Sequence, residues 1–196
     1  MSKVRLSCWK TLLRVTTVCV ACVLVLNAEV PHGWYLAGTK PAEYEAGVDP
    51  GQTYRGHDSA FLKSKRPSVD GFGTLMQGIN AEQYKGDTVR LSALVKSEEV
   101  TGWAGLWMRV DKGTDPLAFD NMQKRPIIGT TGWQRYYVVL DVPKDATNIA
   151  FGILLSGPGQ VWVNRTKFEI VGLDVPATGA SQKTLPDKPV NLEFND

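Results

Sequence analysis

The fold is decided by the stretch Thr101-Gly-Trp-Ala-Gly-Leu-Trp-Met-Arg-Val-Asp111, which is followed by a loop at 112–116 and by Leu117-Ala-Phe-Asp-Asn-Met-Gln123. Its first half alternates, and one parity is purely apolar: Ala104, Leu106, Met108 and Val110. A period of two is typical of a β-strand that turns one face toward a core. We therefore expect a half-buried strand here.

The opposite parity of the same stretch carries two indoles, a glycine and a guanidinium, from Trp103, Gly105, Trp107 and Arg109. Clustered aromatic side chains on a surface usually mark a contact site. The alternative is that both faces are buried, between two sheets or under a loop. No catalytic motif lies beside the stretch, so the sequence favours a binding fold over a reaction.

Other segments with strand character lie on both sides of this stretch. They are 34–36, 59–64, 72–79, 89–96, 133–142, 149–155 and 160–171. Turns rich in Gly, Pro and Asp separate them, and no helical period of useful length occurs after residue 28. The pattern predicts an all-β, antiparallel β-sandwich, for which a jelly roll is the natural topology at this length. Because 149–155 is apolar on both faces, it should be a central strand.

The first 28 residues differ from the rest of the chain. A basic start is followed by an apolar run at 15–26, which two threonines interrupt, and by Asn27-Ala28. This layout predicts a secretory signal peptide, with an uncleaved membrane anchor as the alternative. We therefore expect a secreted, periplasmic or cell-envelope protein. The sandwich should occupy 29–175, and 176–196 should form a polar tail that could supply an edge strand.

Cysteine usage and charge support this division. All three cysteines, Cys8, Cys19 and Cys22, lie in the leader, so the mature domain must be held together by its core without disulfides. The leader also holds four cations and no acid, and its removal changes the formal charge from +2 to −2. A mature domain of this charge is not expected to bind nucleic acid, and it would meet a membrane only through an uncleaved leader.

Several segments together resemble galactose-binding-like jelly rolls, which include many carbohydrate-binding modules. They are Phe72-Gly-Thr-Leu-Met-Gln, Tyr84-Lys-Gly-Asp-Thr-Val-Arg-Leu-Ser-Ala, Trp133-Gln-Arg-Tyr and Gly159-Gln-Val-Trp-Val-Asn-Arg-Thr-Lys-Phe-Glu. Gly-Trp-Ala-Gly-Leu-Trp-Met-Arg-Val-Asp and Phe-Asp-Asn-Met-Gln more specifically resemble a bacterial domain that occurs alone or attached to AraC-type transcription regulators. This resemblance covers nearly all of 33–171 and implies a jelly roll, without fixing its activity.

The chain departs from the pattern of that domain at two places. Relatives often have Asp-Asp where this chain has Asn164-Arg165, and an acid there helps to bind a structural calcium ion in many such jelly rolls. Because Asn164 offers one neutral carbonyl in place of that acid, we predict, against the analogy with these folds, that no tight calcium site is present. A segment that resembles the first strand of the relatives, Asn191-Leu-Glu-Phe, instead ends this chain.

The candidate ligand-binding residues are those of the aromatic parity and its neighbours: Trp103, Trp107, Arg109, Asn121 and Gln123. Apolar faces of sugars stack on aromatic rings, while Arg, Asn and Gln can satisfy the surrounding hydroxyls. Phe119 has the same parity as Asn121 and Gln123, so this segment would extend the face if it pairs with the Trp strand. Packing in the core or between loops is the competing interpretation.

The other residues of types that can bind metals or catalyse reactions are given no functional role. Asp111, Asp115 and Asp120 lack the spacing of a metal loop, and His32 and His57 lack zinc spacing. Glu98 and Glu99 are best explained as a solvated turn. We therefore predict a non-catalytic domain, without catalytic residues, metal or cofactor, that binds carbohydrate or a related small polar ligand. The alternatives are a protein-interaction or sensor domain linked to transcriptional regulation, and a hydrolase with unrecognised carboxylates.

Overall fold

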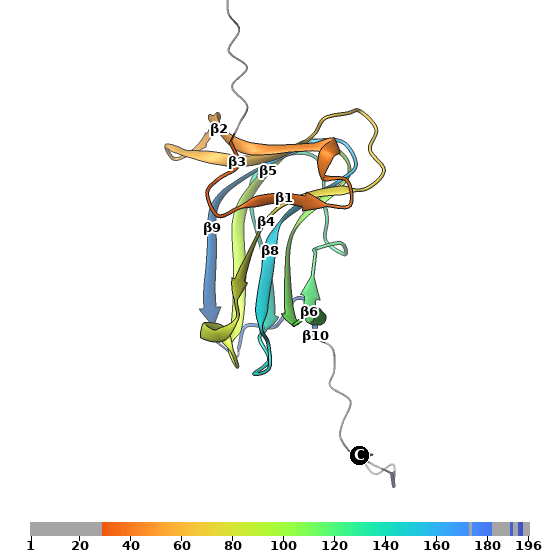
Figure 1. Ribbon diagram of the computed structural model, residues 1–196. Helices are drawn as coiled ribbons and strands as arrows, with labels where there is room; N and C mark the ends of the chain where they lie inside the picture. Colours follow the sequence, from red (N-terminus) through yellow and green to blue (C-terminus); the bar gives the residue numbers. More distant parts are fainter. Residues whose placement is uncertain (1–28, 173, 182–188, 190–191, 194–196) are drawn as a thin grey trace, which may run out of the picture.

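Strand β5, Thr88–Lys112, runs through both layers of the molecule and organises the fold (Figure 1). Its first half pairs with β7 (Ile127–Asp141) on one side and β9 (Gln160–Val171) on the other. Its second half pairs with β8 (Asn148–Ser156) and β6 (Asp115–Asp120). One strand therefore contributes to two sheets, which fold over each other.

The computed structural model describes residues 29–172, 174–181, 189 and 192–193. The predicted leader, 1–28, lies outside the described residues, as does most of the segment around Asn191 that could form an edge strand. No helix within the described residues is long and apolar enough to span a membrane.

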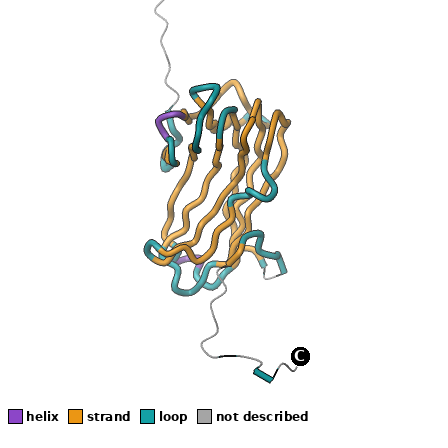
Figure 2. Tube along the Cα trace, turned by 90° about the vertical axis from the view of Figure 1, so that its right-hand side faces the viewer, coloured by secondary structure: helices purple, strands orange, loops and turns teal. Residues whose placement is uncertain are grey.

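Two antiparallel layers result from this arrangement (Figure 2). The first layer has the order β1 (Tyr35–Gly38), β4 (Phe72–Asn80), β8, β5, β6 and β10 (Ala180–Ser181). The second has the order β7, β5, β9, β3 (His57–Ser64) and β2 (Tyr44–Tyr54). Two single-turn 3-10 helices, η1 (Pro41–Glu43) and η2 (Glu82–Tyr84), complete the described structure. The predicted antiparallel sandwich is confirmed.

The core lies between the inner faces of the two layers. Phe151 of β8 stacks on Phe168 of β9 with ring centroids 4.9 Å apart, and Trp34 meets the Phe151 ring edge-on. On β5 the predicted inner parity is confirmed, because Ala104, Leu106, Met108 and Val110 are all at most 2% exposed. Strand β8, apolar on both faces, lies between β4 and β5 as predicted for a central strand.

The turn between β8 and β9 packs tightly against β5 at the point where β5 passes from one layer to the other. The backbone N–H of Thr101 donates to the carbonyl of Pro158 at 3.1 Å. Gly159 has φ +132°, and a Cβ on it would lie 2.6 Å from the Cα of Val100. Only glycine combines this backbone conformation with so close an approach. The passage of β5 between the layers thus depends on the absence of a side chain at Gly159.

Two elements differ from the sequence prediction. The segments 89–96 and 101–111 form one continuous strand, with register shifts near the crossing instead of a break. Strand β2 is not among the strands predicted from the sequence. It continues through Asp49-Pro-Gly51, whose composition is typical of a turn, because a bulge between Asp49 and Thr53 accommodates those residues. The Asp49 carboxylate accepts the N–H of Gly51 at 2.9 Å and satisfies the irregular backbone there.

The segment after β9 returns to the edges of both layers. Thr178 exchanges hydrogen bonds with Val139 of β7, since its N–H donates to the Val139 carbonyl and its Oγ1 accepts the Val139 N–H at 2.9 Å. Ala180 then pairs with Phe119 of β6. The tail therefore contributes a two-residue edge strand at 180–181.

Candidate functional site

The outer face of the first layer holds the residues predicted from the sequence. Trp103, Trp107 and Arg109 lie on this face of β5, and Phe119 of β6 lies directly opposite Arg109. Asn121 follows β6, and a Cβ on Gly105 would come within 2.8 Å of its backbone oxygen. The structure therefore places Trp103, Arg109, Phe119 and Asn121, which we call the Trp103 surface, along one face of the first layer, with Gln123 exposed in the turn beyond it.

Trp107 does not fit its predicted role. It is only 8% exposed and packs with Ala150 and Leu154 of β8, while its indole N–H donates to Thr74 Oγ1 at 2.7 Å. Its ring thus fills a small second core on the outer face, which half-buried Trp103 partly covers. The prediction that Trp107 offers its ring to a ligand is corrected, because packing has already covered that ring.

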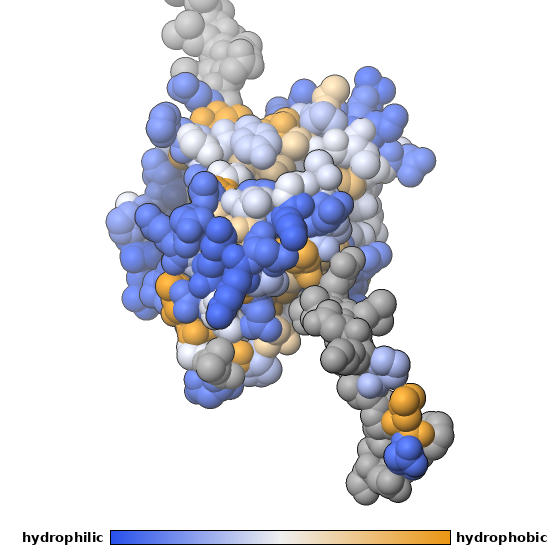
Figure 3. All heavy atoms as spheres, turned by 60° about the horizontal axis from the view of Figure 1, so that its bottom comes forward, coloured by the Kyte–Doolittle hydropathy of each residue, from blue (hydrophilic) through white to orange (hydrophobic). Residues whose placement is uncertain are grey.

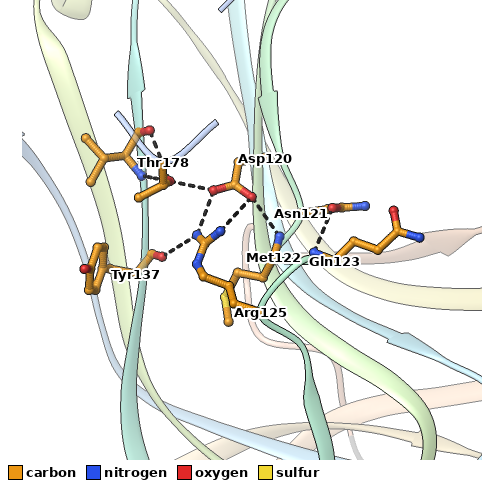
Figure 4. A network of polar contacts seen from close by, with 8 residues as sticks. Asp120, Asn121, Met122, Gln123, Arg125, Tyr137 and Thr178 are labelled. Carbon is orange, nitrogen blue, oxygen red and sulfur yellow. Dashed lines mark hydrogen bonds and ion pairs between the residues drawn. The ribbon is translucent and has the colours of Figure 1, made fainter. Parts of the chain in front are cut away.

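The polar side chains of the Trp103 surface are held by other protein groups. The Arg109 guanidinium forms an ion pair with Asp111, Nε to Oδ1 at 2.8 Å, and Asp111 also accepts from the Asn148 amide at 2.9 Å. The Asn121 Oδ1 accepts the backbone N–H of Gln123 at 3.0 Å (Figure 4). Arg109 is still 48% exposed. A ligand on this face would compete with these contacts or share them.

A different face, the outer side of the second layer, contains a trough that the sequence did not reveal. Three neighbouring strands, β7, β5 and β9, place Tyr137, Ser92 and Lys167 in one row across the sheet. The trough has a volume of about 330 Å³, at the lower end of the range of about 300–1,000 Å³ that is typical of small-ligand sites. Its lining residues are Arg90, Ser92, Arg135, Tyr137, Lys167 and Glu169.

The shape of this trough follows from side-chain size. Ser92 in the middle is short and 5% exposed, whereas Tyr137 on one side is 52% exposed and Lys167 on the other is exposed. Neighbouring strands are about 4.8 Å apart, so the two walls rise from positions about 10 Å apart. The row therefore has a low floor between an aromatic wall and a cationic wall, which suits a small ring with polar substituents.

Fixed charges border the trough. The Arg90 guanidinium donates from Nε and Nη2 to Glu169 Oε1 at 3.2 and 2.9 Å, which holds both side chains across the β5–β9 pair. Arg135 and Lys167 have no carboxylate partner among the residues that the structure describes. The lining thus contains three cations and one anion, so the trough is positively charged.

The tip of the β2–β3 hairpin closes one end of this face. Asp49 accepts the Trp162 indole N–H at 2.8 Å, and Gln52 accepts the Lys96 ammonium at 2.9 Å while that ammonium lies over the Trp162 ring. The Tyr54 ring meets Trp133 of β7 at 5.8 Å between centroids. The hairpin therefore reaches across the sheet from β2 to β7 and limits the length of the open surface.

A buried polar network joins β6, β7 and the tail (Figure 4). Asp120 accepts from the Arg125 guanidinium at 2.7 and 3.1 Å, from Thr178 Oγ1 at 2.5 Å and from the Met122 N–H at 2.8 Å. Burial by itself raises the pKa of Asp120, but these hydrogen bonds outweigh burial and leave the pKa below its ordinary value. The network is structural, because protein donors occupy the carboxylate.

Asn164 lies where the resemblance would place a calcium-binding acid. It is 5% exposed, and its Nδ2 donates to the carbonyls of His57 and Asp58 at 3.0 and 3.1 Å and to Ser59 Oγ at 2.9 Å. The neutral side-chain amide of Asn164 therefore donates to these three oxygens. Within the described residues, no three His, Cys, Asp or Glu side chains gather in a way that could hold a metal ion.

Two further hollows lie outside these faces. One of about 310 Å³ opens between the layers near Pro31 and Arg165 and ends on core residues such as Leu91. The other, about 810 Å³, lies along the β5 crossing and contains Glu98 and Glu99, both exposed. Elsewhere, hydrophobic residues on the surface seen in Figure 3 form separate small patches among hydrophilic ones, so that side shows no broad apolar interface.

Comparison with known sequences gives one curated relative and no family. No model of a known protein family matches the chain. An uncharacterized HTH-type transcriptional regulator, YbfP of Bacillus subtilis (strain 168), is 45% identical over 167 residues, which make up 84% of this chain and 57% of the regulator. The chain thus spans little more than half the length of this relative.

Solved structures show the same fold. The CBM22-1 xylan-binding domain of Paenibacillus barcinonensis Xyn10C superposes with a TM-score of 0.52 at 14% identity, over 74% of this chain and 90% of that domain. The CBM22-1 and GH10 modules of Clostridium thermocellum Xyn10B, complexed with xylohexaose, match with a TM-score of 0.51 at 17% identity, over 74% of this chain and 27% of that one. The predicted jelly roll is confirmed, and at this identity the likeness shows the fold alone.

Proposed function

We propose that the protein is a non-catalytic binding domain for carbohydrate or a related small polar ligand, and that the trough of the second layer holds that ligand. The observation that carries the proposal is the row Tyr137–Ser92–Lys167, a low floor between an aromatic and a charged wall. Apolar faces of sugar rings stack on aromatic side chains, and charged groups bind hydroxyls strongly. The carbohydrate-binding-module-like fold supports a binding role.

An oligosaccharide array followed by titration of intrinsic fluorescence tests this proposal. Tyr137→Ala should lower the affinity for a ligand found on the array by at least about tenfold, because it removes one wall of the trough. Tyr35→Ala is the matched control, since Tyr35 is exposed to a similar extent, 49% against 52%, but lies on β1 of the first layer. If both variants bind as the wild type does, the trough is not the site.

The Trp103 surface, as predicted from the sequence, is the competing location for the same function. Trp103→Ala in the same titration distinguishes the two faces, because Trp103 lies on the first layer and Tyr137 on the second. A loss of affinity in Trp103→Ala, with Tyr137→Ala unchanged and both variants folded by circular dichroism, would place the ligand on the first layer instead.

A sensor role in transcriptional regulation is the second candidate function, favoured by the 45% identity to an HTH-type regulator. In this role the domain would bind its ligand and change the activity of a regulatory partner or of an attached module. A chimera tests it: the matching segment of the Bacillus subtilis regulator is replaced by this domain, and expression of a reporter is measured. Expression that changes with the ligand supports sensing, whereas expression that ignores a ligand bound by the isolated protein refutes it.

We further propose that the protein is exported through its N-terminal leader, on the basis of the basic start and the apolar run at 15–26. Mass spectrometry of the protein from the exported fraction should find an N-terminus near residue 29. A retained N-terminus in the membrane fraction would indicate an anchor, and an intact chain in the cytoplasm would contradict export.

A further inference from the structure

The charges of the trough specify its ligand further than its shape does. Of the four ionic side chains that line it, only Arg90 and Glu169 form an ion pair with each other. Arg135 comes from β7 and Lys167 from β9, so the two unpaired cations lie on opposite sides of the strand that carries Ser92. Like charges repel, and neither cation forms an ion pair among the described residues that would offset this cost.

The position of the two cations points toward an anion rather than toward hydroxyls alone. Leu94 and Ser92 are successive outward residues of β5, and they pair with Arg135 and Tyr137 of β7 respectively. Lys167 faces Ser92 from the other side. Arg135 and Lys167 therefore lie on opposite sides of Ser92, one residue pair out of line with each other. Both side chains are long enough to approach a group that rests on Ser92. A guanidinium binds a carboxylate through a fork of two N–H groups, and an ammonium adds a point charge.

Other charged groups of this face have partners within the protein, among them Asp141, which accepts the Thr88 hydroxyl. Lys96 donates to Gln52 and covers Trp162, and Asp49 accepts the Trp162 N–H. The one carboxylate in the lining, that of Glu169, accepts both of its bonds from Arg90. Among the described residues, nothing else at the trough would repel a negative ligand, and the two free cations give it a net positive charge.

On the basis of the proposed function, we infer that the ligand of this trough is an acidic saccharide, a sugar that carries an anionic group. Its ring lies over Ser92 against the Tyr137 ring, and its anion lies between Arg135 and Lys167. A uronic-acid carboxylate and a sulfate ester offer the same negative oxygens, so either can supply this chemistry. The inference adds the charge of the ligand to a site that shape alone assigns to sugars.

Calorimetric titration of the full chain tests the inference with three probes of equal length: an oligogalacturonate, a sulfated oligosaccharide and a neutral xylo-oligosaccharide. At least one acidic probe should bind at least about tenfold more tightly than the neutral one, and its affinity should fall as salt is added, because exposed charges are screened. Arg135→Gln and Lys167→Gln should each weaken that binding about tenfold. Lys40→Gln is the matched control, since it removes an exposed cation from the β1–η1 turn, outside the lining of the trough.

The outcomes separate this inference from the proposed function. Preference for the galacturonate or for the sulfated probe supports the inference and identifies the source of the anion. Equal binding of neutral and acidic probes, unaffected by Arg135→Gln and Lys167→Gln, overturns the inference and leaves the proposed function standing. If no saccharide binds, the proposed function fails and the inference fails with it. Melting temperatures of the variants within about 2 °C of the wild type show that any loss of affinity is not a loss of fold.

Discussion

Replacing Asp120 by alanine should destabilise the domain strongly, since this carboxylate connects β6, the turn after it and the tail (Figure 4). The substitution leaves the buried Met122 N–H without its acceptor, and it leaves the Thr178 hydroxyl with only the longer contact to the Val139 carbonyl at 3.3 Å. Hydrogen bonds to a charged group are each worth about 1.5–3 kcal/mol, and an unsatisfied buried donor costs about 1–3 kcal/mol. Because the Arg125 side chain is 38% exposed and can turn to water, we discount its share.

The expected cost at pH 7 is about 3 kcal/mol of unfolding free energy. For a domain of about 150 residues, this corresponds to a fall of about 6–12 °C in melting temperature. Differential scanning calorimetry and urea unfolding measure the two quantities. Asp115→Ala is the control, because Asp115 is exposed and its replacement should change the unfolding free energy by no more than about 0.5 kcal/mol.

The pH dependence supplies a second check on Asp120. Its pKa in the folded protein lies below the ordinary value, since donors from Arg125, Thr178 and Met122 outweigh burial. The stabilisation is therefore fully present above the unfolded-state pKa, near pH 4, and is lost as the pH falls through the lower folded-state value. The difference between wild type and Asp120→Ala should shrink below about pH 4. A difference under about 1 kcal/mol at neutral pH, or one that persists undiminished at pH 2, would refute the reasoning.

Three further substitutions test other parts of the structure. The melting temperature of the wild type should not respond to EDTA or Ca²⁺, and a wild type whose stability depends on calcium would contradict this. Asn164→Asp should lower the free energy of unfolding, measured by calorimetry, by about 3 kcal/mol, because a negative charge would then face three oxygens. Trp107→Phe should lower the free energy of unfolding in urea by about 2 kcal/mol, since the buried Thr74 hydroxyl loses the indole N–H that donates to it. An unchanged urea midpoint would count against this prediction. Gly159→Ala should cost at least about 2 kcal/mol, because the new Cβ would meet the Val100 Cα at 2.6 Å; a variant as stable as the wild type would disprove the need for close approach.

Patterning along the sequence predicted the fold where one face of a strand is apolar. Ala104, Leu106, Met108 and Val110 face the core as their alternation indicated, and β8 is central because it is apolar on both faces. Patterning failed at Pro50, where composition predicts a turn but a bulge lets strand β2 continue. The continuity of β5 was also hidden, since glycines near the crossing resemble a break in a strand.

The candidate site was harder to predict, because it depends on which strands become neighbours. Trp103 and Trp107 have the same parity, yet only the packing of β8 and β4 against them shows that Trp107 is covered. Tyr137 and Lys167 reach one trough only when β7 and β9 pair with opposite edges of β5. Side-chain parity can be read locally, whereas these pairings join distant parts of the chain.

The shared strand β5 also has a consequence for how the chain folds. Two of its partners, β8 and β9, lie far away in the sequence, as the ion pair between Arg90 and Glu169, 79 residues apart, illustrates. Pairings at such separations must first overcome the entropy of closing long loops, so topologies of this kind fold in about milliseconds to seconds. Until β9 has been synthesised, the first half of β5 has one unpaired edge. We therefore expect a chain shortened before residue 160 to fail as an independent folding unit and to aggregate, because its exposed strand edges would pair between molecules.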